Sequence, residues 1–429
     1  MSAEMTRRKV FAIVYGLILA VVTLAGVEIM ASFYAPSWPA RELRSSEPVN
    51  VNSDAFKSIT GKPWMFRPFN SWGMNDRERM LAKPADIRFR NIFIGDSFIE
   101  TAMARWTLPE TVERRFAEAG KGGIEIVNLG ISGTGPRSYY YRLRDVALSM
   151  SPDALLAFFY SGNDFMLPGT GYGDALLPPL VDESSRSSIL GNIMPRANWL
   201  VVNRLRLSEF LGGNKPIPDE FETVNAIVHG PANQRVARLV RHVKRYYHPD
   251  VPEDRLTEIL SRGDDEFWRV MERRPIDEEY LMGWLLNLIV WSELNEGPDP
   301  TRKNPGSARL VVDEKVEASL SWLLAMDRLA RTRGVPFVLF LIPVATVDPE
   351  YVELWKPWPS LLIWNRFAED LHERLAMALQ RTSVHVVDLR ADFNGVRGTY
   401  RKTDGHWTEK GVDIAADRVQ AEIERLLPR

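Results

Sequence analysis

A strand-like run meets a turn in the stretch Asn91-Ile92-Phe93-Ile94-Gly95-Asp96-Ser97-Phe98. The apolar residues end at Gly-Asp-Ser, so the pattern predicts a strand whose carboxyl end presents the Ser97 hydroxyl where another molecule can reach it. By itself the tripeptide is an ordinary turn signal. Its meaning therefore depends on the segments that accompany it along the chain.

Apolar strands alternate with amphipathic helices around this stretch. The predicted strands are Ile87 to Ile94, Ile124 to Leu129, Ala154 to Tyr160, Pro336 to Ile342 and Val384 to Leu389. The predicted helices are Leu108 to Ala119, Arg137 to Ser149, Val316 to Arg333, Leu361 to Gln380 and Thr408 to Leu427. The third strand is apolar throughout, as expected for a strand buried on both faces. This alternation predicts an α/β fold with a parallel sheet covered by helices on both sides.

An uncharged apolar stretch near the N-terminus predicts a membrane anchor. Arg7-Arg8-Lys9 precedes Val10 to Val27, and after Glu28 the apolar residues continue to Tyr34. The stretch reaches the roughly 20 residues that cross a bilayer, and the basic residues before it predict a cytoplasmic N-terminus with the rest of the chain exported. A cleaved signal peptide is the alternative, with a usual apolar core of about 7–15 residues. We expect an uncleaved signal anchor in the inner membrane.

Composition shifts divide the remaining chain. Residues 1–35 form the predicted tip and anchor, 36–86 a linker, 87–165 the first part of the α/β core, 166–310 a mostly helical insertion and 311–429 the second part of the core. The insertion follows the third strand, at the edge where open parallel sheets bind ligands. We therefore expect it to form a cap beside a site at that edge.

Bulk composition narrows the function classes. The chain has 429 residues, 45% hydrophobic and 26% charged, which is typical of a folded protein with a sizeable core. A formal net charge of -2 gives no reason to expect nucleic acid as a partner. The chain contains no cysteine, so disulfides and thiolate chemistry are excluded. The motifs call for no metal or cofactor.

Four segments together supply the groups for acyl transfer. This chemistry needs a nucleophile, a base and donors aimed at the oxygen that becomes negative. Ser97 is the predicted nucleophile and His406 the predicted base, with Asp404 two positions away to hold its ring. Gly130 and Asn163 end the second and third strands at the same sheet edge, so we expect Gly130 N–H, the Asn163 amide and Ser97 N–H to form an oxyanion hole.

The ordered set resembles the SGNH (GDSL-type) hydrolase superfamily. Its four blocks match Gly95-Asp96-Ser97, Asn128-Leu129-Gly130, Gly162-Asn163-Asp164 and Asp404-Gly405-His406. One departure is that Asp404 precedes His406 by two residues and not three. The resulting Asp-x-His-Trp form is similar to that in SGNH-like proteins of bacterial exopolysaccharide acetylation. The resemblance implies a flavodoxin-like three-layer α/β/α sandwich and activity on esters, with water or a sugar hydroxyl as acceptor.

Three functions remain open at this point. The first is an anchored O-acetyltransferase or acetylesterase acting on a cell-envelope polysaccharide, with an integral membrane acyltransferase as one expected partner. The second is a general or lipid esterase, and the third is a non-catalytic subunit of a membrane complex.

Several polar and aromatic residues also have simpler interpretations. Asp404 could cap the last helix, although Thr408 could cap it instead. Asp96 and Asp164 are expected to bond backbone in their turns. His385 and Asp388 are expected at the edge of the core. The tryptophans at positions 355, 358 and 364 are expected to pack under the insertion, with stacking on sugar rings as the alternative.

Overall fold

The computed structural model describes residues 74–100, 106–166, 220–271, 283–294, 305–403 and 405–428, together with Asn70 and helical pieces between residues 11 and 30. The chain divides into two compact units. The first comprises Met1–Glu42, Ser71–Gly73 and Pro178–Pro216, and the second comprises Leu43–Asn70, Met74–Leu177 and Ile217–Arg429. The second unit contains the sheet and the candidate site.

The described part of the first unit is helical and apolar. Residues 19–30 are helical, and three of their apolar residues, Leu19, Val22 and Ile29, are more than half exposed. Within the part of the chain that the structure describes, no helix is both long and apolar enough to cross a membrane. The predicted anchor, which runs from Val10 to Tyr34, lies partly outside the described residues.

The second unit is built on a five-stranded parallel sheet in the order β2-β1-β3-β4-β5. The strands are β1 (Phe89–Gly95), β2 (Ile124–Gly130), β3 (Ala154–Tyr160), β4 (Phe337–Ile342) and β5 (His385–Asp388). All five predicted strands are confirmed, with ends that shift by one or two residues. The register pairs Gly95 with Gly130, so the Gly-Asp-Ser turn and the loop after β2 leave the sheet side by side.

Helices connect the strands. The core helices are α4 (Ser97–Glu100), α5 (Leu108–Glu118), α6 (Pro136–Asp145), α16 (Pro305–Thr332), α17 (Pro349–Trp355), α18 (Pro359–Leu379), α19 (Arg390–Phe393) and α20 (Glu409–Leu426), with short 3₁₀ turns at Ala147–Met150, Asp164–Met166 and Ala345–Val347. The helix predicted from Val316 begins earlier, at Pro305, and the short helices α4 and α17 were not predicted.

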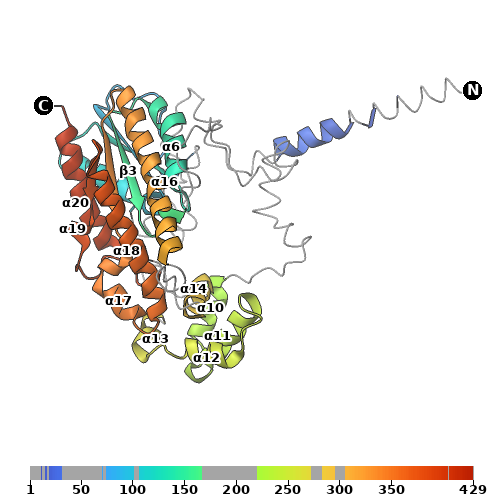
Figure 1. Ribbon diagram of the computed structural model, residues 1–429. Helices are drawn as coiled ribbons and strands as arrows, with labels where there is room; N and C mark the ends of the chain where they lie inside the picture. Colours follow the sequence, from blue (N-terminus) through green and yellow to red (C-terminus); the bar gives the residue numbers. More distant parts are fainter. Residues whose placement is uncertain are drawn as a thin grey trace, which may run out of the picture. The chain divides into compact units, whose positions relative to one another are not determined.

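The helices form a layer on each side of the sheet, as the alternation of strands and helices predicts. On one side α5 packs against β2 and α20, and on the other α6 and α16 pack together, with α18 beside α16. Figure 1 shows α20 on one side of β3 and α16 and α6 on the other. The strand order with its reversal at β1 is that of a doubly wound sheet, which binds ligands at the carboxyl ends of its strands.

The segment before β1 is part of the packed core, which corrects the prediction that residues 36–86 are a linker. Met74 and Arg79 are 2% and 4% exposed. Arg79 Nη2 donates to Ile126 O (2.5 Å), and Asp76 Oδ2 accepts Asn128 N–H (2.9 Å), both on the outer side of the edge strand β2. Polar residues look like linker residues in the sequence, but ion pairing allows them to be buried here. Residues 36–69 lie outside the described residues.

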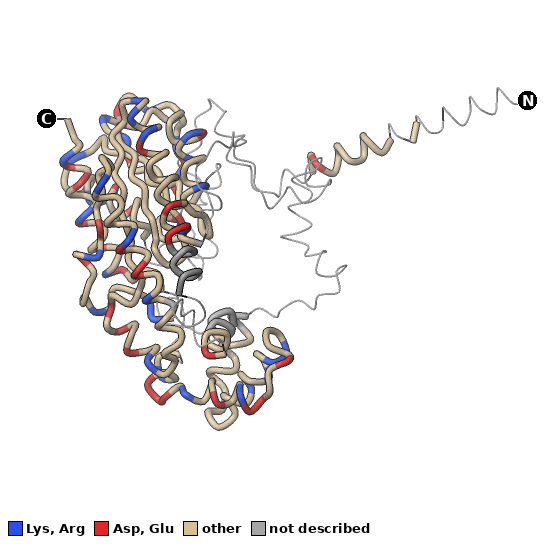
Figure 2. Tube along the Cα trace, viewed as in Figure 1, with Lys and Arg blue, Asp and Glu red and all other residues tan. Residues whose placement is uncertain are grey.

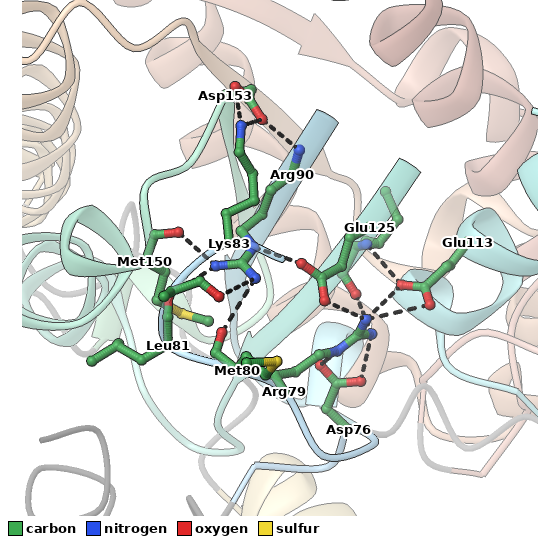
Figure 3. A network of polar contacts seen from close by, with 12 residues as sticks. Asp76, Arg79, Met80, Leu81, Lys83, Arg90, Glu113, Glu125, Met150 and Asp153 are labelled. Carbon is green, nitrogen blue, oxygen red and sulfur yellow. Dashed lines mark hydrogen bonds and ion pairs between the residues drawn. The ribbon is translucent and has the colours of Figure 1, made fainter. Parts of the chain in front are cut away.

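Charged side chains form a continuous network at the amino end of β1 and β2 (Figure 3). Arg90 is 0% exposed, and its Nε donates to Glu125 Oε2 (2.5 Å) while its Nη1 donates to Met150 O (2.6 Å). Asp153 bonds both Lys83 Nζ (2.8 Å) and Arg90 N–H (2.7 Å). Removing one partner of such a buried network leaves an uncompensated charge, so the network stabilises only as a complete set.

The described part of the predicted insertion is mostly helical. It contains α10 (Glu220–Val228), α11 (Ala232–Tyr246), α12 (Glu253–Leu260), α13 (Asp265–Met271) and α14 (Gly283–Leu294). Trp358 Nε1 donates to Ile259 O of α12 (2.9 Å), and the rings of Trp358 and Phe267 of α13 are 4.7 Å apart. Acidic and basic residues alternate over the described helices of core and insertion (Figure 2). The insertion is therefore packed onto the start of α18 by buried aromatic contacts.

Candidate active site

Ser97 lies directly after β1, at the carboxyl edge of the sheet. It is the first residue of α4 and is partly exposed, whereas Gly95 and Asp96 before it are buried. An added Cβ at Gly95 would lie 2.5 Å from Ile99 Cγ1, so glycine allows α4 to pack back onto the strand. This tight turn places the Ser97 hydroxyl at the end of the strand, as the sequence pattern predicts.

The structure brings His406 to Ser97 across 309 positions of sequence. His406 Nε2 lies 2.7 Å from Ser97 Oγ. The imidazole ring packs on Phe98, whose ring centroid is 4.9 Å away and which is itself fully buried. A serine hydroxyl at this distance from an imidazole nitrogen can pass its proton to the ring as it attacks.

A tight turn holds His406 in place. Arg401 N–H donates to His406 O (2.6 Å), and Gly405 N–H donates to Arg401 O (3.0 Å). Gly405 has a φ of +73°, a conformation that favours glycine. Trp355 Nε1 donates to Lys402 O in the same turn (2.5 Å). The turn is thus closed by its own backbone and tied to α17.

Asp404 lies outside the described residues, so its predicted contact with His406 stays a prediction. The alternative that Asp404 caps the last helix is wrong. The N-cap of α20 is Thr408, whose Oγ1 accepts Gly411 N–H (3.3 Å) and donates to Gly398 O (2.7 Å). Asp404 is therefore not needed as a helix cap.

Gly130 ends β2 as predicted, but its N–H is already engaged. It donates to Asn128 Oδ1 (2.8 Å), and an added Cβ at Gly130 would lie 2.4 Å from Glu100 N. This glycine is required by the close packing of α4, which corrects its expected role as an oxyanion donor. Three positions further, Gly133 has a φ of +70° and open space where a Cβ would point, so a ligand can approach its backbone.

Asn163 follows β3 and lies beside the turn that carries Ser97. Its side-chain amide bonds the Asp96 carboxyl, and Asn163 itself is partly exposed. An added Cβ at Gly162 would lie 2.4 Å from the Tyr160 ring, so a glycine is needed before Asn163. The loops after β1 and β3 are thus joined through Asp96 and Asn163 at the predicted edge.

Asp96 and Asp164 are fully buried and bond backbone in their turns, as expected. Asp96 Oδ1 accepts Phe98 N–H (3.0 Å), and Asp164 accepts Tyr160 N–H (2.9 Å) and the Tyr139 hydroxyl (2.9 Å). Burial raises the pKa of both carboxyls, and the charge of Asp96 raises the pKa of Asp164 further. These groups shape the turns and do not face a substrate.

Arg142 and Glu100 complete the polar layer behind the turn. Arg142 Nη2 donates to Gly95 O (2.9 Å), and burial lowers the Arg142 pKa to about 10. Glu100 Oε2 accepts Ser132 N–H (2.8 Å) in the loop that contains Gly133, and burial raises the Glu100 pKa. The loop after β2 is therefore tied to α4 by a buried carboxyl group.

The remaining predicted residues have structural partners. Trp355 and Trp358 are buried, which confirms that they pack under the insertion, and the Trp364 side chain lies outside the described residues. His385 Nε2 lies 3.0 Å from Glu422 Oε2. Asp388 bonds a residue that sequence reasoning missed, His372 of α18, whose Nε2 is 3.0 Å from Asp388 Oδ1.

The C-terminal part of the chain is similar to a known protein family. Residues 353–429, which include His406, match a family model described as the SGNH hydrolase-like domain of acetyltransferase AlgX. No curated protein matches the chain. Among solved structures, a GDSL-like lipase from Bacteroides thetaiotaomicron is 11% identical, with 80% of this chain and 92% of that chain covered and a TM-score of 0.32. A lipase/acylhydrolase from Enterococcus faecalis is 12% identical, with 80% and 98% covered and a TM-score of 0.28.

These solved structures have TM-scores too low to carry an argument about this chain. The evidence comes from the family match and from the geometry of the site. The matched segment contributes His406 and the capped helix behind it, and the Gly-Asp-Ser turn outside that segment contributes Ser97. Residues 353–429 are therefore similar to an SGNH hydrolase-like domain, and Ser97 and His406 have the geometry of a serine nucleophile and its base.

Proposed function

We propose that the chain is an exported, membrane-anchored serine acyl-transfer enzyme that moves acetyl groups on or off a cell-envelope polysaccharide. The observation that carries the proposal is the 2.7 Å separation of His406 Nε2 and Ser97 Oγ at the carboxyl edge of the sheet. The description of the matched family as an acetyltransferase supports the acetyl group. The exposed apolar helix over residues 19–30 supports the anchor.

The reaction has two half-steps. Ser97 Oγ attacks the ester carbonyl while His406 Nε2 takes the hydroxyl proton, and the carbonyl oxygen becomes negative. His406 then protonates the departing alkoxide, which leaves an acetylated Ser97. In the second half-step water or a sugar hydroxyl loses its proton to His406 and attacks the acyl group. The bond from the acyl carbon to Ser97 Oγ then breaks, and His406 returns the proton to Oγ, which regenerates Ser97 and the neutral base. Asp404 is assigned to orient His406 and to stabilise its charged form.

Three donors face the negative oxygen in this proposal. They are the Ser97 N–H, the Asn163 side-chain NH₂ and the Gly133 N–H, which replaces that of Gly130. The open space beside Gly133 and the engaged N–H of Gly130 support this exchange. Removing one donor of an oxyanion hole typically costs a factor of about 10²–10³ in kcat.

An acceptor assay tests the proposed substrate class. The full chain in detergent is incubated with an activated acetyl ester and an oligosaccharide, and acetylated sugar is measured by mass spectrometry. We expect sugar acetylation by the wild type and none by Ser97→Ala. Ser149→Ala serves as the matched control, because Ser149 Oγ bonds Val146 O far from the site. Release of free acetate without sugar product would favour an esterase over a transferase.

A fusion assay tests the proposed location. A reporter that is active only outside the cytoplasm is joined after Arg429, and membranes are washed with high salt. We expect an active reporter that stays with the membrane fraction, which fits a single-pass anchor with a cytoplasmic N-terminus. Recovery of a shortened soluble chain would establish a cleaved signal peptide.

A further inference from the structure

A second set of hydrogen-bonded serine, histidine and carboxylate side chains begins two residues before Asn163 of the candidate site. Ser161 Oγ is 2.6 Å from His372 Nδ1, and His372 Nε2 is 3.0 Å from Asp388 Oδ1. Asp388 is held from its other side by Arg390, whose Nε donates to Oδ2 (2.9 Å). The three residues come from the end of β3, from α18 and from β5, so the chain of bonds joins three separate elements.

The bonds assign the proton of the His372 imidazole when the ring is neutral. The Asp388 carboxylate accepts and does not donate, so His372 Nε2 carries the hydrogen and donates to it. His372 Nδ1 is then the acceptor, and the Ser161 hydroxyl donates to it. Both ring nitrogens are therefore hydrogen-bonded. His372 is held by Asp388 of β5 and in turn sets the orientation of the Ser161 side chain.

Burial excludes this serine from attack on a substrate. Ser161 and His372 are each 1% exposed. A nucleophile must be reached by a carbonyl group, and an acyl intermediate on Ser161 would have no room inside the packed core. The pair therefore has the chemistry of a catalytic dyad but not its access, and its role lies in what it holds.

The residue held is the one before Gly162-Asn163. Ser161 N–H donates to Ile342 O (3.1 Å), which continues the pairing of β3 with β4 for one residue beyond the strand. After it the chain turns sharply, with Gly162 against the Tyr160 ring and Asn163 against Asp96. Ser161, two residues before Asn163, is therefore held in place by hydrogen bonds of both its main chain and its side chain.

We propose that His372 is a positioning residue that fixes the Asn163 amide through Ser161. This inference rests on the proposed function, in which Asn163 donates to the negative oxygen. Donors act on the transition state only when they are pre-oriented, and a misplacement of about 1 Å far from the chemistry can cost about 10²-fold in rate. The bonds between Ser161, His372 and Asp388 supply that orientation from α18, which lies on the same side of the sheet as α6 and its Tyr139.

The helix that carries His372 is itself anchored at its start. Ser360 N–H donates to Glu293 Oε1 of the insertion (3.0 Å), and Trp358 Nε1 donates to Ile259 O (2.9 Å). Helix α18 is thus held by the insertion at one end and by Asp388 and Ser161 further along. A rigid helix is what a positioning residue requires.

Steady-state kinetics with a chromogenic acetyl ester tests the role. We expect Ser161→Ala and His372→Gln each to lower kcat by about 10-fold or more while KM changes by less than about twofold, because the donor acts on the transition state. The double variant should have about the same kcat as the less active of the two single variants, because both substitutions break the same series of hydrogen bonds. The affinity for a boronic acid, which forms a tetrahedral adduct with the nucleophile, should fall by the same factor as kcat.

His385→Gln is the matched control. It breaks another histidine–carboxylate pair, with Glu422, at the opposite end of the same strand, and the His385 side chain is half exposed. We expect it to leave kcat and boronate affinity at wild-type values. An equal loss in this control, an unchanged kcat in a folded Ser161→Ala variant, or a change confined to KM would overturn the positioning role.

Labelling of Ser97 separates failure of this inference from failure of the proposed function. A fluorophosphonate should label Ser97 in the wild type and in Ser161→Ala, with slower labelling in the variant. If the wild type is neither labelled nor active, the proposed function is overturned and this inference with it. If the wild type is labelled and Ser161→Ala reacts at the same rate, only the positioning role is overturned.

Discussion

Two serine–histidine pairs stand at the carboxyl edge of one sheet, and they differ mainly in access. Ser97 and His406 are partly exposed, whereas Ser161 and His372 are each 1% exposed. The separations of the bonded atoms are nearly equal, at 2.7 Å and 2.6 Å. Residue types and distances alone therefore do not identify a nucleophile, because a substrate must also be able to reach it.

The two imidazoles are also used in opposite orientations. Ser97 meets Nε2 of His406, and Ser161 meets Nδ1 of His372. His406 lies in a turn after β5, where its ring packs on Phe98, whereas His372 lies within α18 and bonds Ser161 and Asp388. One ring is placed to exchange a proton with a substrate, and the other is placed to join elements.

The largest expected effect distinguishes the two serines directly. Ser97→Ala should lower kcat for an acetyl ester by about 10⁴-fold or more, because the loss of a nucleophile disables the whole constellation. Ser161→Ala should cost about 10-fold, consistent with a role in positioning. Turnover and circular dichroism are measured for both. Comparable losses in the two variants would erase the distinction.

An intermediate effect is expected at Asp404. Asp404→Asn keeps the shape of the side chain but favours the wrong imidazole tautomer of His406, so we expect a loss of at least about 10²-fold in kcat, smaller than that of Ser97→Ala. Asp388→Asn is the parallel change in the buried pair and should cost less activity. A wild-type rate for Asp404→Asn would reduce the exposed site to a serine–histidine dyad.

The pH profile should follow the exposed pair. Activity should rise as the pH approaches and passes about 7, because His406 must be neutral to accept the Ser97 proton. The Ser161→Ala variant should give the same profile at a lower maximum. Rates are recorded from acid to mildly alkaline pH with a substrate whose leaving group does not titrate. A shifted midpoint in that variant would mean that the buried pair also affects the base.

The smallest expected effect is on stability. Burial disfavours the charged form of Asp388, but hydrogen bonds from His372 and Arg390 outweigh it and lower the Asp388 pKa. A carboxyl with a lowered folded pKa stabilises the fold above its unfolded value of about 3.9 and loses this contribution as the pH falls toward the folded pKa. Asp388→Asn should therefore lower the free energy of unfolding by about 1–2 kcal/mol at pH 7.

Urea unfolding at several pH values measures this contribution. The difference between wild type and Asp388→Asn should shrink below pH about 4. Asp370→Asn is the control, because Asp370 is half exposed and pairs with Arg374 on the same helix as His372. A difference that stays constant with pH would show that the Asp388 charge does not contribute.

The strands and the exposed pair could be predicted because their signals are local. β3 is a short apolar run, Ser97 follows a strand, and His406 precedes the last helix, with the serine and the histidine each within a recognisable motif. His372 could not be predicted, because it lies inside the amphipathic helix α18 and its partners depend on how that helix crosses the sheet. The structural role of Gly130 could not be predicted either, because it depends on how closely α4 packs against this glycine.

The segment before β1 escaped prediction for a different reason. Arg79 and Asp76 look solvent-exposed in sequence, but each is buried against a charge of opposite sign. Periodicity describes apolar faces and carries no information about which charges will pair. The same holds for Arg90, a charged residue at the amino end of a buried strand.

The side chains that cover β2 also protect the protein from self-association. An uncovered edge strand offers its N–H and C=O groups as a template for strands of other molecules. Here Glu113, Arg79 and Asp76 occupy the groups of Ile126 and Asn128 that face outward. A shortened protein that starts at residue 87 would lose two of these three side chains, and its open edge would invite aggregation even though every strand of the sheet remained.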